Sequence, residues 1–533
     1  MKRSNMLRRI GSASEPWDVI IVGGGATGLG AAVESASRGY RTLLLEQDDF
    51  CKGTSSRSTK LIHGGVRYLA QGDVSLVRDA LRERGRLMAN ASHLVRRLAL
   101  VIPRYRFYEG FYYGLGLKIY DWLAARRNLG SSRLLGKSET LRLLPTLEPK
   151  GLRGGVLYYD GQFDDARVAV ALARTAADQG ATLLNYAPVT GLLKSGSKIS
   201  GVAAEDRLGG GSMELSGKVV VNATGVFCDA IRRSDNPQAE EIVAASRGSH
   251  LVLDRSFLPS EAALLIPKTR DGRVLFVIPW RGRTLVGTTD ISTQEKPLDP
   301  WPLQEEVEYM LAHAAQYLTR DPQREDILSM FTGLRPLVKG DSQEATKSLS
   351  RDHTLLVSDS GLVTVTGGKW TTYRKMAQDT IDRAAQAGGL PAVPSATKHL
   401  RLHGHREDPG SGGRFASYGS DAQYLEELIA ADESLGRSLH ENLPYCRAEV
   451  LWAVREEMAC RVEDVLSRRT RSLLLDANAA IACAPQVARM MARELEEDES
   501  WAERECRRFI ETAQTYLPAT EQIRPVRNEP GKP

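Results

Sequence analysis

A short run of apolar residues followed by glycines opens the regular part of the chain. Residues 17–22 have the sequence WDVIIV, which is typical of a buried parallel strand. Residues 26–38 are rich in small side chains and end before Gly39, which predicts a helix. A second apolar run at 42–45, ending at Glu46, predicts the next strand. The order strand, helix, strand indicates the start of a parallel α/β sheet.

The same pattern returns further along the chain. Residues 168–179 predict a helix, and further strands of the sheet are expected at 181–186, 218–221 and 362–365. Residues 246–300 instead alternate apolar and polar side chains, which indicates an antiparallel sheet. We therefore expect the first sheet to be discontinuous, with strands from three separated stretches of sequence.

The two ends of the chain differ from its middle. Residues 1–16 carry Lys and Arg but no long apolar run, so we expect a frayed basic leader. Residues 391–420 are rich in Pro, Gly, Ser and His, which is typical of a linker. Beyond them the pattern is charged and helical. Apolar residues at spacings of three and four from Val450 to Leu466 predict one amphipathic helix.

Composition narrows the class of protein. The 533 residues are 42% apolar and 26% charged, which is ordinary for a globular enzyme. The net charge of +5 only weakly favours an anionic partner. The sequence shows no cluster of basic and aromatic residues, so it does not predict nucleic-acid binding. The six cysteines lack C-x-x-C spacing and a neighbouring His cluster, so we expect a reducing compartment and no metal site. No apolar stretch is long enough to predict a transmembrane helix.

Three glycines after the first strand have the spacing G-x-G-x-x-G, at Gly23, Gly25 and Gly28. The first permits a tight turn, the second lets phosphates approach the backbone, and the third lets the helix pack closely. The helix N-terminus then offers free N–H groups to a pyrophosphate. Glu46 can accept hydrogen bonds from ribose hydroxyls, which disfavours a 2′-phosphate and hence NADP. The loop alone leaves NAD and FAD open.

A longer set of motifs resembles the FAD-dependent glycerol-3-phosphate dehydrogenases. The run GTSSRSTKLIHGGVRYL at 53–69 is similar to the segment after the second strand in that family. The likeness continues in DDAR (164–167), NATG (222–225), RGSH (247–250), FVIPW (276–280), GTTD (287–290), GLRPL (333–337), GGKWTTYR (367–374), VED (462–464) and RRTR (468–471). Together these motifs are specific, and the resemblance covers residues 17 to 515.

This resemblance implies three structural parts. They are a discontinuous Rossmann-like FAD-binding domain, an antiparallel-sheet substrate domain like that of amino-acid oxidases, and a C-terminal all-helical cap. The expected boundaries are 17–75, 150–245 and 330–390 for the FAD-binding part, 76–149 and 246–329 for the substrate part, 391–420 for the linker and 421–533 for the helical domain.

The resemblance also implies an activity. By similarity, the protein oxidises sn-glycerol 3-phosphate to dihydroxyacetone phosphate, FAD is bound non-covalently, and a membrane quinone receives the electrons. The family is peripheral on the membrane, and we expect the inner, cytoplasmic face of a bacterial membrane with an anionic surface. A homodimer is compatible with this picture. Two alternatives stay open, an oxidase that uses oxygen and a flavin-binding protein without turnover.

The chemistry requires a base for the C2 hydroxyl, cations for the phosphate and a flavin aligned with the C2 hydrogen. His63 and His250 share the expectation for the base equally, and Arg335 and Lys369 complete the catalytic set. By resemblance the substrate contacts are Arg67, His250, Arg335, Lys369 and Thr371. The cofactor contacts implied in the same way are Gly23, Gly25, Gly28, Glu46, Ser55, Ser56, Leu61, Ile62, Val189, Ala223, Thr224, Gly225, Gly368, Lys369 and Thr371.

One aromatic segment has no place in this set. Residues 107–123 are rich in Phe, Tyr and Trp and are followed by Arg126 and Arg127. Tyr and Trp suit a membrane interface, and arginines suit anionic headgroups. The alternative is a buried helix pair that lines the substrate domain.

Overall fold

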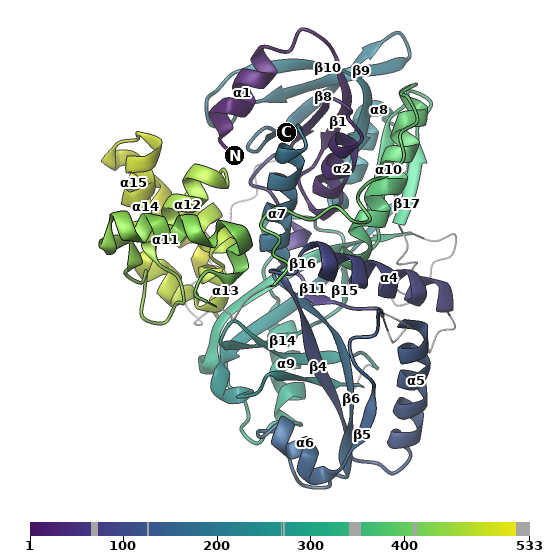
Figure 1. The fold of residues 1–533 in the computed structure, drawn as a ribbon, viewed down its shortest axis with the longest axis vertical. Helices are drawn as coiled ribbons and strands as arrows, with labels where there is room; N and C mark the ends of the chain where they lie inside the picture. Colours follow the sequence, from purple (N-terminus) through teal and green to yellow (C-terminus); the bar gives the residue numbers. More distant parts are fainter. Residues whose placement is uncertain are drawn as a thin grey trace.

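The computed structural model describes residues 1–65, 73–124, 127–267, 269, 272–339, 353–408 and 413–518. Within these ranges the chain forms two large sheets and a separate group of C-terminal helices (Figure 1). The first sheet lies in the upper part of Figure 1 and the second in the lower part, while α11 to α15 gather at the left. The expected division into a discontinuous α/β part, an antiparallel part and a helical part is therefore confirmed.

The first sheet has the strand order β17-β18-β10-β1-β2-β7, with β8 and β9 continuing from β10. Its strands are β1 (Trp17–Val22), β2 (Thr42–Leu45), β7 (Thr182–Leu184), β8 (Val189–Ser195), β9 (Lys198–Glu205), β10 (Ser212–Asn222), β17 (His353–Val357) and β18 (Val363–Gly367). The strands β18, β10, β1, β2 and β7 are parallel. Val19, Ile20 and Ile21 have no exposed surface, as an apolar run in a parallel sheet requires.

Three helices cover this parallel sheet. They are α2 (Ala26–Ser37), α7 (Asp165–Asp178) and α10 (Tyr373–Ala387), and α2 packs between the other two (Figure 1). The short helix α8 (Cys228–Asp235) follows β10. Because all the parallel strands end at the same edge, the loops that follow β1, β2, β10 and β18 meet there.

The second sheet has the order β15-β11-β14-β13-β12-β4-β6-β3, with β16 on β11 and β5 on β6. Its strands are β3 (Leu61–Ile62), β4 (Val95–Arg104), β5 (Arg133–Leu135), β6 (Gly154–Phe163), β11 (Val243–Asp254), β12 (Ala262–Ile266), β13 (Leu275–Trp280), β14 (Arg283–Gly287), β15 (Ile291–Thr293) and β16 (Ile327–Val338). The helices around it are α4 (Val74–Asn90), α5 (Glu109–Ala124), α6 (Lys137–Leu143) and α9 (Gln304–Ala315).

Three of these strands differ from the boundaries expected for the FAD-binding part. The strands β3, β6 and β16 pair within the second sheet, although the sequence grouped their residues with the first. β6 pairs with β4 along its whole length, and β16 pairs with β11. The sheet to which a strand belongs is decided by the strand with which it pairs. When that partner is far away in the sequence, the local pattern of apolar residues does not indicate the sheet.

The C-terminal part contains α11 (Ala422–Ala431), α12 (Arg447–Glu456), α13 (Ser472–Leu475), α14 (Ala477–Leu495) and α15 (Glu499–Gln514). The single helix expected from Val450 to Leu466 is wrong, because α12 ends at Glu456 and a π-helix follows at Asp464–Arg469. Met458 adopts a left-handed φ of 55°, which breaks the helix. Apolar residues of α12 to α15 share one core with the second sheet, including Phe331.

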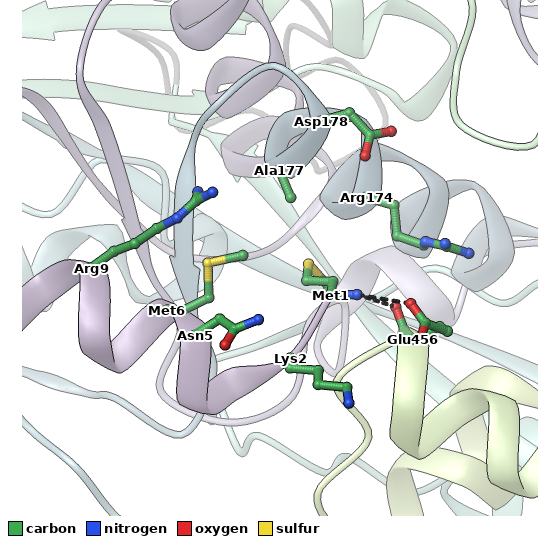
Figure 2. A pocket seen from close by; sticks show the side chains of 9 residues that line it. All are labelled: Met1, Lys2, Asn5, Met6, Arg9, Arg174, Ala177, Asp178 and Glu456. Carbon is green, nitrogen blue, oxygen red and sulfur yellow. Dashed lines mark hydrogen bonds and ion pairs between the residues drawn. The ribbon is translucent and has the colours of Figure 1, made fainter.

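The N-terminal segment is a helix and not a frayed leader, so that expectation is wrong. Helix α1 (Arg3–Gly11) buries Met6 and Ile10. Arg3 donates from Nη2 to Asp206 Oδ1 at 2.8 Å, and the Met1 ammonium donates to the Glu456 carbonyl at 3.0 Å (Figure 2). A cavity of about 360 Å³ lies at this junction, and its lining carries charges of both signs. The helix thus ties the first sheet to the C-terminal helices.

The described residues of the expected linker are also bonded to the body of the protein, at α4 and α7. Leu402 N donates to Asn90 O at 2.9 Å, and His403 N donates to Thr175 Oγ1 at 2.8 Å. The segment therefore runs along α4 and α7 before the helical domain begins.

Candidate functional site

The loop between β1 and α2 has the shape of a phosphate site. Gly25 is the N-cap of α2 and supplies no capping side chain. The N–H of Ala26 donates to Ser55 Oγ at 2.9 Å. A Cβ at Gly28 would lie 1.8 Å from Gly23 O, so only glycine lets the helix start this close to the strand. Helix α2 thus begins directly at the glycine loop, and a pyrophosphate site at this loop stays a prediction.

Glu46 lies at the end of β2 beside this loop. Its Oε2 accepts the Gly24 N–H at 2.6 Å, and its Oε1 accepts the Asp48 N–H at 3.0 Å. Burial raises the pKa of Glu46 to about 7, and the two N–H donors oppose this rise. Ribose hydroxyls would supply further donors to the ionised carboxylate. The geometry thus fits the nucleoside end of a dinucleotide.

The other predicted cofactor residues come from several separate elements. Ser55 and Ser56 form the 3₁₀ turn η1 (Thr54–Ser56), and the Ser55 carbonyl accepts the Trp370 Nε1–H at 2.8 Å. Ala223, Thr224 and Gly225 follow β10, Val189 begins β8, Leu61 and Ile62 form β3, and Gly368 follows β18. A Cβ at Gly23 would lie 2.7 Å from the Ala223 carbonyl, so the loops after β1 and β10 meet closely. The residues present therefore fit a dinucleotide lying across the ends of the parallel strands.

One cavity of about 1600 Å³ collects the predicted reaction residues. It is lined by His63, His250, Arg335, Lys369 and Thr371. They come from the loop after β3, from β11, from β16 and from the turn η6 (Trp370–Thr372) with the residue before it. The site thus lies between the two sheets. Arg67 is outside the described residues.

His250 is buried on β11 with its ring held on two sides. The ring stacks on Phe331 at a centroid distance of 4.8 Å, and Nε2 lies 2.9 Å from Thr59 Oγ1. Among the described residues, Nδ1 has no hydrogen-bond partner. Burial, with the nearby charges of Lys60 and Arg335, holds the pKa of His250 well below its usual range. The imidazole is therefore neutral near pH 7 and able to accept a proton.

Arg335 extends from β16 across β11. Its Nη1 donates to Arg247 O at 3.0 Å, and its Nη2 donates to Thr288 Oγ1 and Thr289 O, both at 3.0 Å. A Cβ at Gly248 would lie 2.3 Å from Nη2, so the glycine opposite makes room for the guanidinium. The planar group is held in one orientation at the cavity wall, which suits recognition of a phosphate.

The turn after β18 brings the remaining residues together. Gly368 has a left-handed φ of 71°, and Lys369 follows it as the N-cap of η6. Thr371 Oγ1 donates to the carbonyl of His63 at 3.3 Å. The His63 loop and the Lys369 turn therefore lie side by side at the cavity.

Two charged residues of the site carry no assigned role in the sequence interpretation. Lys60 has no exposed surface, and its Nζ donates to Asp165 Oδ2 at 2.7 Å and to Ser56 O at 2.8 Å. Burial lowers the pKa of Lys60 to about 8, against the opposing effect of Asp165. Arg57 is also buried and donates to Thr332 O at 3.3 Å. Both lie in the motif at 53–69, but only the fold shows that they are buried.

Comparison with known proteins places this site in a family. Residues 18–374 match the family model described as FAD dependent oxidoreductase. Residues 395–502 match the C-terminal domain of alpha-glycerophosphate oxidase. These two matches cover the sheets and most of the C-terminal helices.

Curated relatives match nearly the whole chain. The mitochondrial glycerol-3-phosphate dehydrogenase of Arabidopsis thaliana is 40% identical, over 95% of this chain and 87% of its own length. The mitochondrial enzyme of the same name from Homo sapiens is 38% identical, over 97% of this chain and 75% of its own length.

Among solved structures, the glycerol-3-phosphate dehydrogenase of Bacillus halodurans complexed with FAD has a TM-score of 0.76. It is 28% identical and covers 98% of this chain and 99% of its own. L-alpha-Glycerophosphate Oxidase from Mycoplasma pneumoniae has a TM-score of 0.56 at 18% identity, over 73% of this chain and 98% of its own, a likeness in fold alone.

Proposed function

Since this chain belongs to the FAD-dependent oxidoreductase family and its relatives at about 40% identity are glycerol-3-phosphate dehydrogenases, we propose that it oxidises sn-glycerol 3-phosphate to dihydroxyacetone phosphate. FAD, when bound, accepts the hydride from C2. Gly23, Gly25 and Gly28 hold its pyrophosphate, and Glu46 holds its ribose. The remaining cofactor residues named above are proposed to contact the rest of the cofactor.

The observation that carries the proposal is the composition of the cavity of about 1600 Å³. It places a neutral histidine and two cations together at the edge where the cofactor loops meet. Arg335 and Lys369 form the cradle for the phosphate, and Thr371 adds a hydroxyl. A substrate contact by Arg67 stays a prediction. A cavity of this kind favours a small anionic alcohol over an amine.

We assign the proton of the C2 hydroxyl to His250, with His63 as the alternative base. The low pKa of His250 keeps the imidazole unprotonated, and it also makes the free imidazole a weak base. The phosphate dianion of the substrate offsets the cationic field of Lys60 and Arg335, so basicity rises when substrate binds. The proton of the C2 hydroxyl then passes from its oxygen to the His250 imidazole.

A substrate panel tests this function. Purified holoenzyme is mixed anaerobically with sn-glycerol 3-phosphate, glycerol, a 2-hydroxy acid and an amino acid, and flavin absorbance is followed. We expect bleaching by sn-glycerol 3-phosphate at a rate far above the others. Bleaching by the amine or the unphosphorylated hydroxy acid instead would remove the assignment.

We further propose a membrane quinone as the electron acceptor. The cavity continues from the reaction residues along β4 and α5, where Leu100, Ile102, Tyr113, Leu117 and Ile119 line it. This apolar end supports an apolar acceptor over oxygen, which needs no such surface. Anaerobic turnover with a short-chain quinone is the expected result. Rapid peroxide formation in air, with no quinone reduction, would favour the oxidase.

We also propose that the protein attaches to the membrane surface through α5 and the residues just before it. Phe107 and Trp122 are 86% and 78% exposed, and Tyr108 and Ile119 are also exposed beside the cavity mouth. Aromatic side chains of this kind favour the bilayer interface. None of the described helices is long and apolar enough to span a membrane. Tyr120 is buried against α4, so another face of the helix packs within the protein, as the alternative expectation has it.

The proposed location is the inner face of a bacterial cytoplasmic membrane. All six cysteines are free thiols, which fits a reducing compartment.

Flotation with vesicles that contain anionic lipid tests the attachment through α5. Wild-type protein should float with the vesicles, and the double variant Trp122→Ser with Phe107→Ser should not. Trp501→Ser in α15 serves as the control. Binding unchanged in the double variant would contradict attachment through α5. The homodimer stays a prediction.

A further inference from the structure

The C-terminal helices are joined to the cofactor domain by buried charges. Arg469 donates from Nη1 and Nη2 to the Asp49 carboxylate at 2.6 and 2.9 Å, and Arg468 donates to the same group. Lys52 Nζ donates to Glu463 Oε2 at 2.9 Å. Asp49 and Lys52 lie in the loop between β2 and the turn η1. The helical domain thus contacts the cofactor loop through paired ions withdrawn from water.

Arg471 bonds the cofactor turn itself. It has no exposed surface and precedes α13 with a left-handed φ of 65°. Its Nη1 donates to Ser467 O at 2.9 Å within the helical domain. Its Nη2 donates to Ser56 O at 2.7 Å and to Asp165 Oδ1 at 3.1 Å. One guanidinium therefore connects the helical domain, the cofactor turn and α7.

The same two acceptors organise residues 56–60. Lys60 Nζ donates to Ser56 O and to Asp165 Oδ2. Ser58 donates to Asp165 Oδ2 from its N–H at 3.0 Å and from its Oγ at 2.7 Å. Asp165 and the Ser56 carbonyl are thus held between two cations, and the backbone from 56 to 60 is fixed by the acceptors that these cations orient.

We propose that Arg471 is a positioning residue for the redox reaction. It acts through Ser56 and Asp165 on the segment that presents Thr59 to His250, where Thr59 Oγ1 lies 2.9 Å from Nε2. The inference rests on the proposed function for the identity of the reaction. It makes the helical domain part of the catalytic geometry and not only a cap, because a residue outside both sheets orients the candidate base.

Removing this guanidinium leaves Lys60 as the cation bonded to Asp165, and it lets residues 56–60 shift. A displacement of about 1 Å at a reacting group costs on the order of 100-fold in rate. We expect Arg471→Met to lower kcat per bound flavin by about 10–100-fold at saturating substrate. Arg471→Lys keeps the charge and a donor but not the planar fork, so its loss should be smaller but still measurable, about 3–10-fold.

Arg469→Met is the matched control. Arg469 is equally buried and bonds Asp49 across the same domain boundary, but no hydrogen bond joins it to Ser56 or Asp165 in the described structure. Both Met variants should lower the thermal midpoint, whereas Arg469→Met should keep kcat per bound flavin within about twofold. The lysine variant decides the matter if Arg471→Met does not fold.

Two results would overturn the inference. The first is an Arg471→Met or Arg471→Lys enzyme with wild-type kcat per bound flavin. The second is an equal loss in Arg469→Met, which would show a general effect of the domain boundary. The visible flavin spectrum separates this inference from the proposed function, since it needs no substrate. It should shift in Arg471→Met and not in Arg469→Met, even if wild type fails to oxidise sn-glycerol 3-phosphate.

Discussion

Truncating Arg335 to alanine tests the phosphate cradle. The guanidinium is fixed by Arg247 O, Thr288 Oγ1 and Thr289 O, so it meets the substrate in one orientation. A hydrogen bond to a charged group contributes about 1.5–3 kcal/mol. Two such bonds to a phosphate give about 3–6 kcal/mol, and the half-buried position favours the lower end. At about 1.4 kcal/mol per tenfold, kcat/KM should fall at least about 100-fold.

The assay is the anaerobic rate of flavin bleaching as a function of substrate concentration. Most of the loss should appear in KM, because the phosphate is bound equally before and during the reaction. Activity with glycerol, which lacks the phosphate, should change little. Arg255→Ala removes an exposed arginine paired with Glu261 and should leave both activities unchanged. An unaltered KM for the phosphorylated substrate, or an equal loss on glycerol, would refute the cradle.

Three further predictions follow from the same geometry. The pKa of His250 is lowered from its usual 6.5, so the neutral base persists as the pH falls. The acid limb of the pH profile of kcat/KM should therefore lie below pH 6.5. An acid limb above pH 6.5 would argue against His250 as the base. Gly28→Ala should yield protein without FAD, since its Cβ would lie 1.8 Å from Gly23 O, whereas Gly11→Ala, in open space, should stay yellow. Glu46→Gln should weaken FAD binding by about tenfold, as judged by flavin release on dilution, because it replaces a charged acceptor with a neutral one.

Local patterns predicted the first strand, helix and strand well. The strand at 17–22, the glycines after it and the acid at position 46 are close in sequence, and each has a conformational requirement that only a few residues meet. The turn at Gly368 and Lys369 was recognisable for the same reason. Such features appear in the sequence because their partners lie within one βαβ unit or one turn.

Features that depend on distant partners were not predictable in this way. The sheet membership of β6 and β16 is decided by pairing with β4 and β11. Helix α12 ends just before Glu457. The Glu457 carboxylate accepts two hydrogen bonds of 2.7 Å from the guanidinium of Arg167, which lies 290 positions away in the sequence. A pattern of apolar spacing does not register such an ion pair, so it predicted one continuous helix.

Buried cations were missed for a related reason. Lys60 and Arg471 look like ordinary surface charges in the sequence, and their shared partner Asp165 is 105 and 306 positions away. Only the packed structure shows that all three are withdrawn from water. The motif around Lys60 indicated the family, but it did not indicate that the Lys60 side chain is buried and bonded to Asp165.

The most direct test of the central claim is an anaerobic titration of the purified yellow protein with sn-glycerol 3-phosphate. The structure and the family together predict that flavin absorbance is lost and that one dihydroxyacetone phosphate appears for each flavin bleached. Absorbance that remains unchanged under this substrate, while an amine or an unphosphorylated hydroxy acid bleaches the flavin, would contradict the account.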